Sequence, residues 1–378
     1  MKDVYISSDN IVSPIGLSSE ENFTQLSKMI SGVKRHENAA MSEEPFYASL
    51  FKEDEVFIKA GNTNTYTKFE QLLIASISDA LKNSSVDPAD KKTILIISST
   101  KGNVSLVETE ALSPSLKKRI SLQHSAKLVS AYFQFANQPL VISNACISGL
   151  LAMITGMRMI HSGQYDHAVI AGADVISKFV LSGFQSFQAI SAQPCKPFDE
   201  SRNGINLGEA AATIVLSSNP AFSKGVKMVA GSVSNDANHI SGPSRTGEEL
   251  YQAIGKAMSD AGLSSADIDL ISAHGTATLY NDEMEAKAIT LAGLQNVPVN
   301  SLKGYYGHTL GAAGLIESIV SIHSLKENLV LPTLGFKHMG VTKPLNVSSS
   351  LQQIELKNCL KTASGFGGCN AAILISKQ

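Results

Sequence analysis

The chain lacks several features that mark common classes of protein. It has no tryptophan, and its 31 basic and 33 acidic residues nearly cancel. Proteins that bind nucleic acids carry an excess of Lys and Arg, so this balance argues against nucleic-acid binding. No apolar run reaches the ~18 residues of a membrane helix. The N-terminal segment carries Asp3 and lacks the long apolar run of a secretory signal. We therefore expect a cytoplasmic protein with no membrane or nucleic-acid partner.

Cysteine is also scarce. The four cysteines stand at positions 146, 195, 359 and 369 and form no Cys-x-x-Cys pair. This spacing disfavours a disulfide framework and a structural zinc site, and it is compatible with a reducing compartment. A thiolate and two imidazoles from Cys146, His274 and His308 would suit zinc chemically. Their wide separation matches no compact zinc motif, so we expect no metal.

Hydrophobic strands and helices alternate along most of the chain. Apolar runs predict buried strands at residues 93–100, 139–144, 167–172 and 211–217. Helical periodicity appears at residues 69–81 and 250–258. The segment 150–160 is almost wholly apolar, which predicts a central buried helix. Such alternation is typical of an α/β protein whose parallel-rich sheets are covered on both faces.

The order of elements recurs within the chain. A helix, a Ser-Ser turn and a strand occupy residues 77–100 and again residues 250–274. The strand, turn and helix around Cys146 recur at residues 297–322. These repeats predict two duplicated halves, 1–222 with Cys146 and 223–378 with His274 and His308. Ligands of α/β sheets gather at strand ends, so the halves would share one site. Residues 32–60 are polar and predict an irregular surface excursion.

Cys146 lies where a hydrophobic strand gives way to a helix. Free amides at a helix N-terminus favour negative charge, which lowers the pKa of a thiol and makes it nucleophilic. A buried core cysteine is the alternative interpretation. Ser143, Ala145, Ser148 and Gly149 are small enough to allow a sharp turn and close approach by a substrate. We therefore predict that Cys146 is a nucleophile.

Two of the nine histidines and one glycine-rich segment accompany this cysteine. His274 and His308 follow predicted strand ends and adjoin glycines, which let a ligand approach the backbone. Residues 365–368 (Gly-Phe-Gly-Gly) lack the Lys-Ser/Thr ending of a phosphate loop. They precede a predicted final strand at residues 370–376, so a turn lining the active site is the favoured interpretation.

Together these segments resemble the β-ketoacyl-acyl-carrier-protein synthases of the elongating, Cys-His-His branch. The resemblance rests on segments 144–146, 273–278, 303–314 and 363–370, and on the Pro-Phe-Asp-x-x-Arg-x-Gly stretch at 197–204. It covers nearly the whole chain. It implies a thiolase-like fold, with two related halves in five αβαβα layers, as a homodimer or as a heterodimer with a related synthase subunit.

The resemblance also implies a reaction and a set of roles. A 3-oxoacyl-[acyl-carrier-protein] synthase carries an acyl chain on Cys146 and condenses it with a decarboxylating malonyl unit. His274 and His308 would stabilise the enolate, and the backbone amides of Cys146 and Phe366 would form an oxyanion hole. Lys303 would be catalytic or would form a buried structural ion pair.

Further roles follow from the same resemblance. Glu285 would pair with Lys303, because an unpaired buried lysine is costly. Phe366 would act as a gate, and Thr276 and Thr278 would bind the phosphopantetheine arm of acyl carrier protein, with no dissociable cofactor. Candidate residues for docking the acidic carrier are basic residues, Lys117, Lys118, Arg119 and Lys196.

Departures from the family pattern leave the substrate open. Leu302, the stretch 279–282 (Leu-Tyr-Asn-Asp) and Ser364 replace residues usual in the family. An aryl-polyene or other polyketide ketosynthase is therefore an alternative to a fatty-acid synthase. A chain-length-factor-like partner subunit is a second alternative, although such subunits typically lose the cysteine. A thiolase acting on coenzyme A is a third, disfavoured by His308 and by the single candidate nucleophile.

Overall fold

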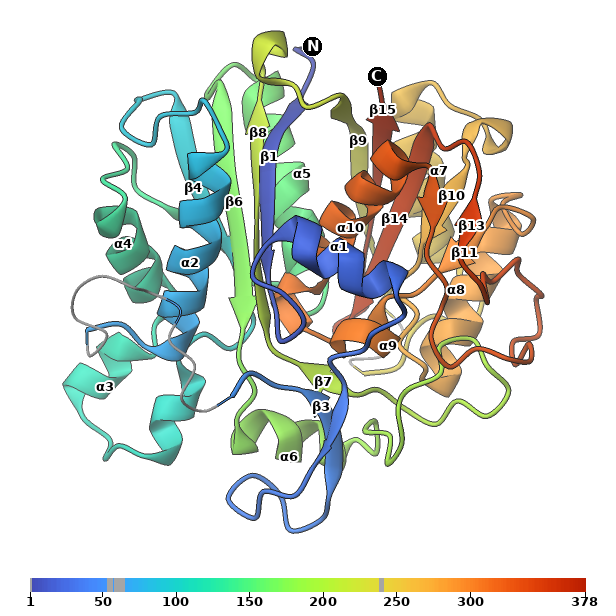
Figure 1. The fold of residues 1–378 in the computed structure, drawn as a ribbon, viewed down its shortest axis with the longest axis horizontal. Helices are drawn as coiled ribbons and strands as arrows, with labels where there is room; N and C mark the ends of the chain where they lie inside the picture. The colour runs from blue at the N-terminus through green and yellow to red at the C-terminus, as the bar shows by residue number, and fades with distance from the viewer. Residues whose placement is uncertain (1, 53–56, 58–64, 238–240) are drawn as a thin grey trace.

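The computed structural model describes residues 2–52, 57, 65–237 and 241–378. Its elements form five layers of alternating helices and sheet (Figure 1). The middle layer holds α5 (Ser148–His161) and α10 (Ala313–Glu327), which pack against each other and against strands on both sides. One outer layer holds α2 (Lys68–Lys82) and α4 (Leu122–Tyr132). The other holds α7 (Glu248–Ala261) and α8 (Leu279–Leu291).

Ten of the strands form one large sheet with a weak seam in its middle. At the seam, β1 meets β9 through a single antiparallel pair, Tyr5 with Lys227. On one side the order is β5 (Leu140–Ile142), β4 (Thr93–Ser98), β6 (His167–Asp174), β8 (Ala210–Ser217) and β1 (Tyr5–Val12). On the other it is β11 (Val299–Asn300), β10 (Leu270–Ser272), β14 (Asn358–Gly365), β15 (Cys369–Lys377) and β9 (Val226–Asn235).

The two sides repeat the same topology. In the first half β1 pairs antiparallel with β8 and β8 with β6, whereas the pairs β6–β4 and β4–β5 are parallel. In the second half β9 pairs antiparallel with β15 and β15 with β14, whereas the pairs β14–β10 and β10–β11 are parallel. The helix before the second strand is α2 on one side and α7 on the other, and the central helices α5 and α10 follow β5 and β11. The predicted thiolase-like arrangement of two related α/β halves is confirmed.

Local sequence explains the main elements. Strands β4 and β8 are buried along their whole length because both faces are covered by helices. Helix α2 begins at a capping box in which the Thr67 side chain and the Glu70 side chain satisfy each other's backbone amides. Helix α7 ends at Gly262, whose φ of 66° is the left-handed conformation that closes many helices.

The remaining elements lie mainly around the core. They are α1 (Ser19–Ser27), α3 (Pro114–Arg119), α6 (Lys178–Ser186), α9 (Lys303–Tyr306), β2 (Lys34–His36), β3 (Phe46–Ser49), β7 (Leu207–Gly208), β12 (Leu329–Val330), β13 (Gln352–Gln353) and the 3₁₀ turns Val104–Glu108, Pro220–Phe222, Ser265–Asp267 and Leu310–Ala312. Among the described residues, no helix is long and apolar enough to cross a bilayer.

The prediction of an irregular surface excursion at residues 32–60 is wrong at Lys34–His36 and Phe46–Ser49, which form strands, whereas the other described residues of the segment are irregular. Strands β2, β3 and β7 form a small sheet below the main one (Figure 1). Phe46 and Ala48 are buried in a hydrophobic cluster with residues of α6. Residues 53–56 and 58–60 of that segment lie outside the described residues.

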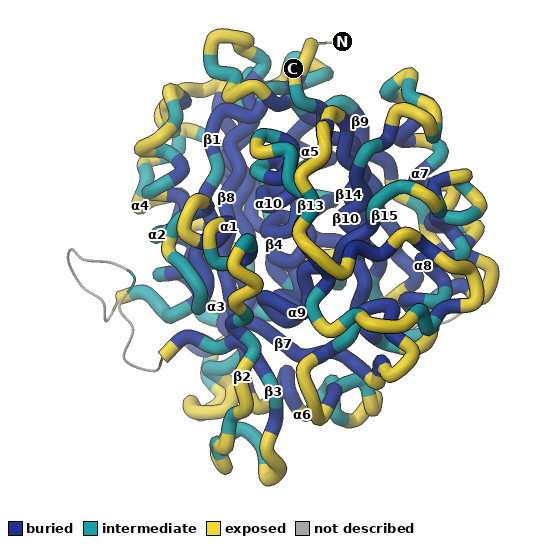
Figure 2. Tube along the Cα trace, turned by 45° about the vertical axis from the view of Figure 1, so that its right-hand side comes forward, coloured by how far each residue is buried: buried dark blue, intermediate teal, exposed yellow. Residues whose placement is uncertain are grey.

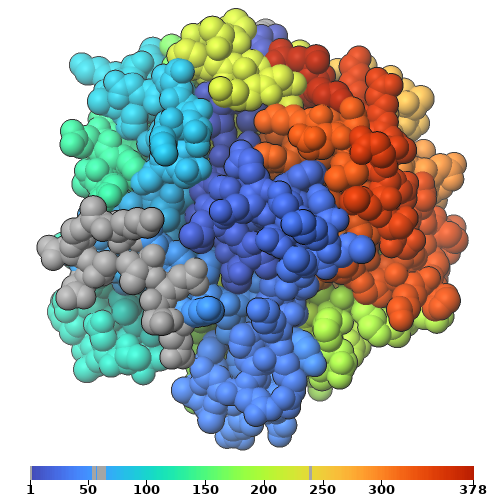
Figure 3. Space-filling model, viewed as in Figure 1, coloured from blue at the N-terminus to red at the C-terminus, as the bar shows by residue number. Residues whose placement is uncertain are grey.

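Buried backbone fills the centre of the molecule, and exposed segments lie on its rim (Figure 2). In the space-filling view the N-terminal segment covers the junction between the two halves (Figure 3). The carboxyl-terminal ends of β5, β10, β11 and β14 lead into the segments that carry Cys146, His274, His308 and Phe366.

Candidate active site

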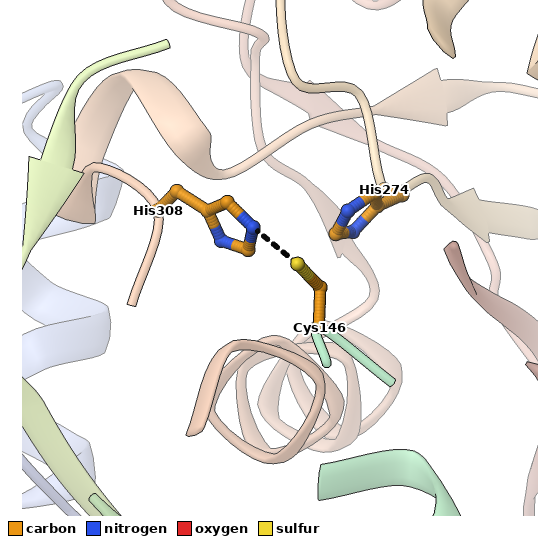
Figure 4. Close-up of side chains that lie close together, drawn as sticks. All are labelled: Cys146, His274 and His308. Atoms are coloured by element: carbon orange, nitrogen blue, oxygen red, sulfur yellow. Dashed lines mark hydrogen bonds between the residues drawn. The ribbon is translucent and has the colours of Figure 1, made fainter. Parts of the chain in front are cut away.

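Three side chains from the two halves converge on one point. The Sγ atom of Cys146 lies 3.1 Å from Nε2 of His308, within hydrogen-bonding distance. The nearest ligand atoms of Cys146, His274 and His308 all lie within 4.8 Å of one another. The two imidazole rings are nearly perpendicular, with centroids 5.2 Å apart. Figure 4 shows both rings facing the sulfur, so a single small group could contact all three.

A tight turn presents Cys146 at the start of the central helix α5. Ala145 has φ of 43°, in the left-handed region that non-glycine residues seldom adopt. The Ser148 hydroxyl accepts from the amide of Asn144 at 2.8 Å and donates to the carbonyl of Ala145 at 2.7 Å. These bonds hold the strained turn closed and aim the thiol toward the imidazoles.

The backbone of His308 is fixed by the glycine-containing stretch at residues 204–208. The His308 amide donates to the carbonyl of Asn206 at 2.6 Å, and the Gly208 amide donates to the carbonyl of His308 at 3.1 Å. A Cβ atom at Gly208 would lie 1.8 Å from the carbonyl oxygen of Tyr306. Only glycine therefore allows this close approach.

His274 is held through its backbone by Glu285 of α8. The carboxylate of Glu285 accepts from the amides of His274 at 2.7 Å and Gly275 at 2.8 Å. It also accepts from the hydroxyl of Thr362 at 2.6 Å. Glu285 is fully buried, so these donors replace the water that it loses on folding. Glu285 thus supports the site as predicted, although by a different contact.

The predicted pairing of Glu285 with Lys303 is wrong. The Nζ atom of Lys303 contacts Oε1 of Glu317, which lies on α10. The second carboxylate oxygen of Glu317 lies 2.7 Å from Nζ of Lys361, on β14. The sequence required some carboxylate near a buried lysine, and the fold supplies it from the central helix because Glu285 is occupied by the His274 turn.

The thiol and both imidazoles are neutral in this environment. Burial raises the pKa of the Cys146 thiol to about 12. Burial, reinforced by the positive charge of Lys303, holds the pKa values of His274 and His308 well below 6.5. The prediction that the helix N-terminus lowers the thiol pKa is wrong, because desolvation raises that pKa. Cys146 must therefore lose its proton as it attacks, and His308 is the base within reach.

The predicted threonines lie beside this site. Thr276 is buried and Thr278 is half-buried, and their hydroxyl oxygens lie 2.9 Å apart on the turn after His274. Asp282, which lies in the first turn of α8, accepts from the amide of Ala277 at 3.2 Å and so fixes the same turn. Burial raises the pKa of Asp282 to about 7.

Phe366 lies at the rim of the site, half-exposed. Its ring stacks on Phe184 at 6.0 Å and meets the edge of Phe187 at 5.4 Å. Phe184 lies in α6, and Phe187 directly follows that helix. The preceding Gly365 packs on the nucleophile, since a Cβ there would lie 2.9 Å from the amide nitrogen of Cys146. The glycine-rich segment therefore lines the site, and Phe366 contacts the aromatic pair on α6.

The residues predicted to dock the carrier protein differ in exposure and in the partners that they contact. Arg119 pairs with the buried Glu70 at 3.1 Å, so its charge supports the start of α2. Lys117 and Lys118 are exposed in the last turn of α3. Lys196 donates to the hydroxyl of Ser201 at 3.0 Å.

Sequence reasoning missed three buried charged residues. Glu317 lies in an otherwise apolar stretch of α10, and Lys361 lies in an otherwise buried strand. Asp174 ends β6 and accepts from the amides of Lys101 at 3.0 Å and Gly311 at 2.7 Å, which ties the loop after β4 to the approach to α10. A charged residue inside an apolar run was the signal available for each of them.

Comparison with known proteins agrees with this geometry. The family model for the N-terminal domain of β-ketoacyl synthase matches residues 2–221, and the model for the C-terminal domain matches residues 226–337. The chain is 29% identical over 411 residues to 3-oxoacyl-[acyl-carrier-protein] synthase 2 of Vibrio cholerae, covering 99% of each chain. It is 33% identical over 253 residues to the enzyme of the same name from Rhizobium meliloti, covering 62% of this chain and 60% of that enzyme.

Solved structures share the fold at lower identity. The ishigamide ketosynthase/chain length factor superposes with a TM-score of 0.91 at 23% identity, over 100% of this chain and 99% of that chain. The ketosynthase ApeO in complex with its chain length factor ApeC, from Xenorhabdus doucetiae, gives 0.88 at 24% identity, over 100% and 98%. With the family models spanning both halves, the chain belongs to the β-ketoacyl synthase family of acyl-condensing enzymes.

Proposed function

We propose that the chain extends acyl groups by two carbons through decarboxylative Claisen condensation, as a 3-oxoacyl-[acyl-carrier-protein] synthase. The observation that carries this proposal is the meeting of one thiol and two neutral imidazoles at a single point. Such a reaction needs a covalent acyl carrier and donors for an enolate, and this site offers both.

In the first step Cys146 takes the acyl group. The sulfur attacks the thioester carbonyl of the acyl donor, and its proton passes to Nε2 of His308, 3.1 Å away. The bond from the carbonyl carbon to the donor sulfur then breaks, and the departing thiolate takes that proton. The backbone amides of Cys146 and Phe366 are the proposed donors to the transient oxyanion.

In the second step a malonyl thioester loses carbon dioxide. The electron pair of the broken carbon–carbon bond becomes an enolate, whose oxygen accepts from the N–H groups of His274 and His308. Before this step His308 exchanges, through water, to the tautomer that carries its proton on Nε2, the nitrogen that faces Cys146. A neutral imidazole has one such donor, which is why the lowered pKa values suit this role. The enolate carbon attacks the acyl carbonyl on Cys146, the carbon–sulfur bond breaks, and the departing cysteine thiolate takes a proton from water.

We propose that Lys303 supports these steps through its positive charge and does not contact the reacting atoms. Its ammonium group contacts Glu317 and is buried. Burial, together with the charge of Lys303, lowers the pKa values of the imidazoles, and the same charge favours the negative charge that the malonyl unit brings.

Delivery by an acyl carrier protein fits the approach to the site. The hydroxyls of Thr276 and Thr278, 2.9 Å apart, would form hydrogen bonds with the phosphopantetheine arm. The reaction requires no dissociable cofactor. The aromatic rings of Phe184, Phe187 and Phe366 at the rim favour an apolar acyl chain. A polyene or other polyketide chain is the alternative to a saturated fatty-acyl chain.

The open edge of the sheet supports a dimer. Strand β5 ends the sheet, and its residues Leu140, Val141 and Ile142 are only half-buried in the single chain. An apolar edge strand of this kind is usually covered. We propose that a second copy of this chain or a related synthase subunit covers it.

Two other functions are less well supported. A chain-length-factor-like subunit needs no nucleophile, whereas this chain keeps Cys146 aimed at His308. A thiolase would use coenzyme A without decarboxylation, and in this site His308 occupies a position suited to stabilising an enolate.

One experiment separates these functions. The purified protein is mixed with acyl-carrier protein and malonyl-carrier protein, and mass spectrometry follows the mass of Cys146 peptides and of the products. We expect an acyl adduct that is absent in Cys146→Ala, followed by a product two carbons longer. An adduct without extension would support a thiolase or a missing partner subunit. No adduct from any acyl donor would support the scaffold function.

A further inference from the structure

Two buried lysines share one carboxylate behind the active site. Lys361 is fully buried on β14, and its Nζ atom lies 2.7 Å from Oε2 of Glu317. The other oxygen of Glu317 is taken by Lys303, which is also buried. A single carboxylate would balance a single lysine, so the second ammonium group needs another explanation.

Lys361 also holds the strand end that carries His274. Its ammonium group donates to the carbonyl oxygens of Ser272 and Ala273, each at 3.1 Å, directly before His274. The neighbouring Thr362 donates to Glu285, which binds the His274 amide. Two adjacent residues of β14 therefore fix the His274 turn from both sides.

The charges around Lys361 come from three other elements. Glu317 faces it from α10, Lys303 from α9 and Glu285 from α8. The positive charge of Lys361 also acts on both imidazoles, together with that of Lys303, and lowers the pKa of each. The malonyl substrate brings a negative charge to the same place, first as a carboxylate and then as an enolate.

We propose that Lys361 is a positioning residue for the condensation step, which fixes the His274 turn and adds a second buried positive charge behind the two imidazoles. It acts through His274 and Glu317 and does not contact the reacting atoms. The inference rests on the proposed condensation, and it predicts that acylation of Cys146 depends much less on Lys361 than condensation does.

The test compares two variants. Lys361→Met keeps the length of the side chain and removes both charge and donor, and Lys361→Gln keeps a donor without the charge. For Lys361→Met we expect near-normal acylation of Cys146 and a loss of condensation of about 100-fold, the size that a displaced catalytic group can cause. Lys361→Gln should recover part of that rate. Lys227→Met is the matched control, because Lys227 is a partly exposed lysine on the same sheet.

The pH dependence separates positioning from mere structural support. Removing a nearby positive charge makes protonation easier, so the pKa values of His274 and His308 rise in both variants. The acid limb of the condensation rate should therefore move to higher pH by about one unit. Nuclear magnetic resonance of ¹³C-labelled histidine rings measures the same shift without any turnover, with His274→Ala and His308→Ala used for assignment.

The outcomes distinguish the role of Lys361 from the proposed condensation itself. Unchanged condensation, or equal losses of acylation and condensation with unmoved ring titrations, would overturn the role of Lys361. A wild-type protein that acylates Cys146 but never extends the chain would instead overturn the proposed function. In that case the ring titrations would still show whether Lys361 acts on the two imidazoles.

Discussion

Replacing Glu317 with Gln tests most directly the buried ion pairs that Glu317 forms with Lys303 and Lys361. The change keeps the shape of the side chain and removes the carboxylate that both Lys303 and Lys361 contact. Those two side chains are 1% and 0% exposed, so water cannot replace the lost partner. Breaking a buried ion pair by removing one member costs about 3–5 kcal/mol of unfolding free energy. We expect Glu317→Gln to reach the upper part of that range, because two cations lose the same partner.

The loss of unfolding free energy in Glu317→Gln should be smaller at alkaline pH than at neutral pH. Burial already lowers the pKa of Lys361, and the charge of Glu317 opposes that shift. Without Glu317 the folded-state pKa falls further, so the folded protein binds fewer protons than the unfolded chain over a wider alkaline range. Stability then rises as pH rises through the folded-state pKa toward the unfolded value. Glu317→Gln should therefore be less destabilised near pH 9.5 than at pH 7.

Urea unfolding followed by circular dichroism measures both effects. Glu327→Gln is the control, because Glu327 is exposed at the end of the same helix, and its change should stay within about 0.5 kcal/mol. Adding Lys361→Met to Glu317→Gln should restore part of the stability by removing one uncompensated charge. A single variant within about 1 kcal/mol of the wild type at pH 7 would refute the reasoning.

Three further predictions concern the site itself. Alkylation of Cys146 by iodoacetamide should rise about tenfold per pH unit from pH 7 to 9.5, because burial raises the thiol pKa to about 12. Mass spectrometry measures this rate, and a plateau below pH 8 would contradict it. Gly208→Ala should abolish condensation, because the added Cβ would lie 1.8 Å from a carbonyl oxygen, whereas Gly183→Ala has open space and should retain activity. Phe187→Ala should change the acylation rate several-fold, because an aromatic contact of about 0.5–1.5 kcal/mol on Phe366 is lost.

Phe179 of α6 provides a control for the proposed gating role of Phe366. Phe179 is 61% exposed on α6, and Phe179→Ala removes a ring of the same size. If Phe179→Ala and Phe187→Ala alter acylation equally, the effect does not depend on the contact between Phe187 and Phe366.

Much of the fold and the three central residues could be predicted from the sequence. The apolar runs gave correct element types because strands buried on both faces and amphipathic helices carry different periodicities. Cys146 and His274 follow the ends of β5 and β10, His308 comes after β11 and the short helix α9, and all three adjoin small residues, which is a local property. Their convergence follows from the repeated topology, since equivalent strand ends of the two halves meet at the central helices.

What the sequence could not provide depends on distance and burial. It showed that Lys303 needed a carboxylate but not whether Glu285 or Glu317 was nearer in space. It showed a helix N-terminus beside Cys146 but not the desolvation that reverses the shift of the thiol pKa. The burial of Phe46 was hidden by the polar residues around it, because packing on α6 is a long-range contact.

The central claim is that one sulfur carries the acyl chain while two imidazoles stabilise the enolate left by decarboxylation. The most direct test supplies malonyl-carrier protein labelled with ¹³C at its free carboxylate to the acylated protein and measures labelled carbon dioxide and the mass of Cys146. The account predicts labelled carbon dioxide in step with loss of the acyl adduct and appearance of a 3-oxoacyl product. Retention of the adduct without release of the label would contradict it.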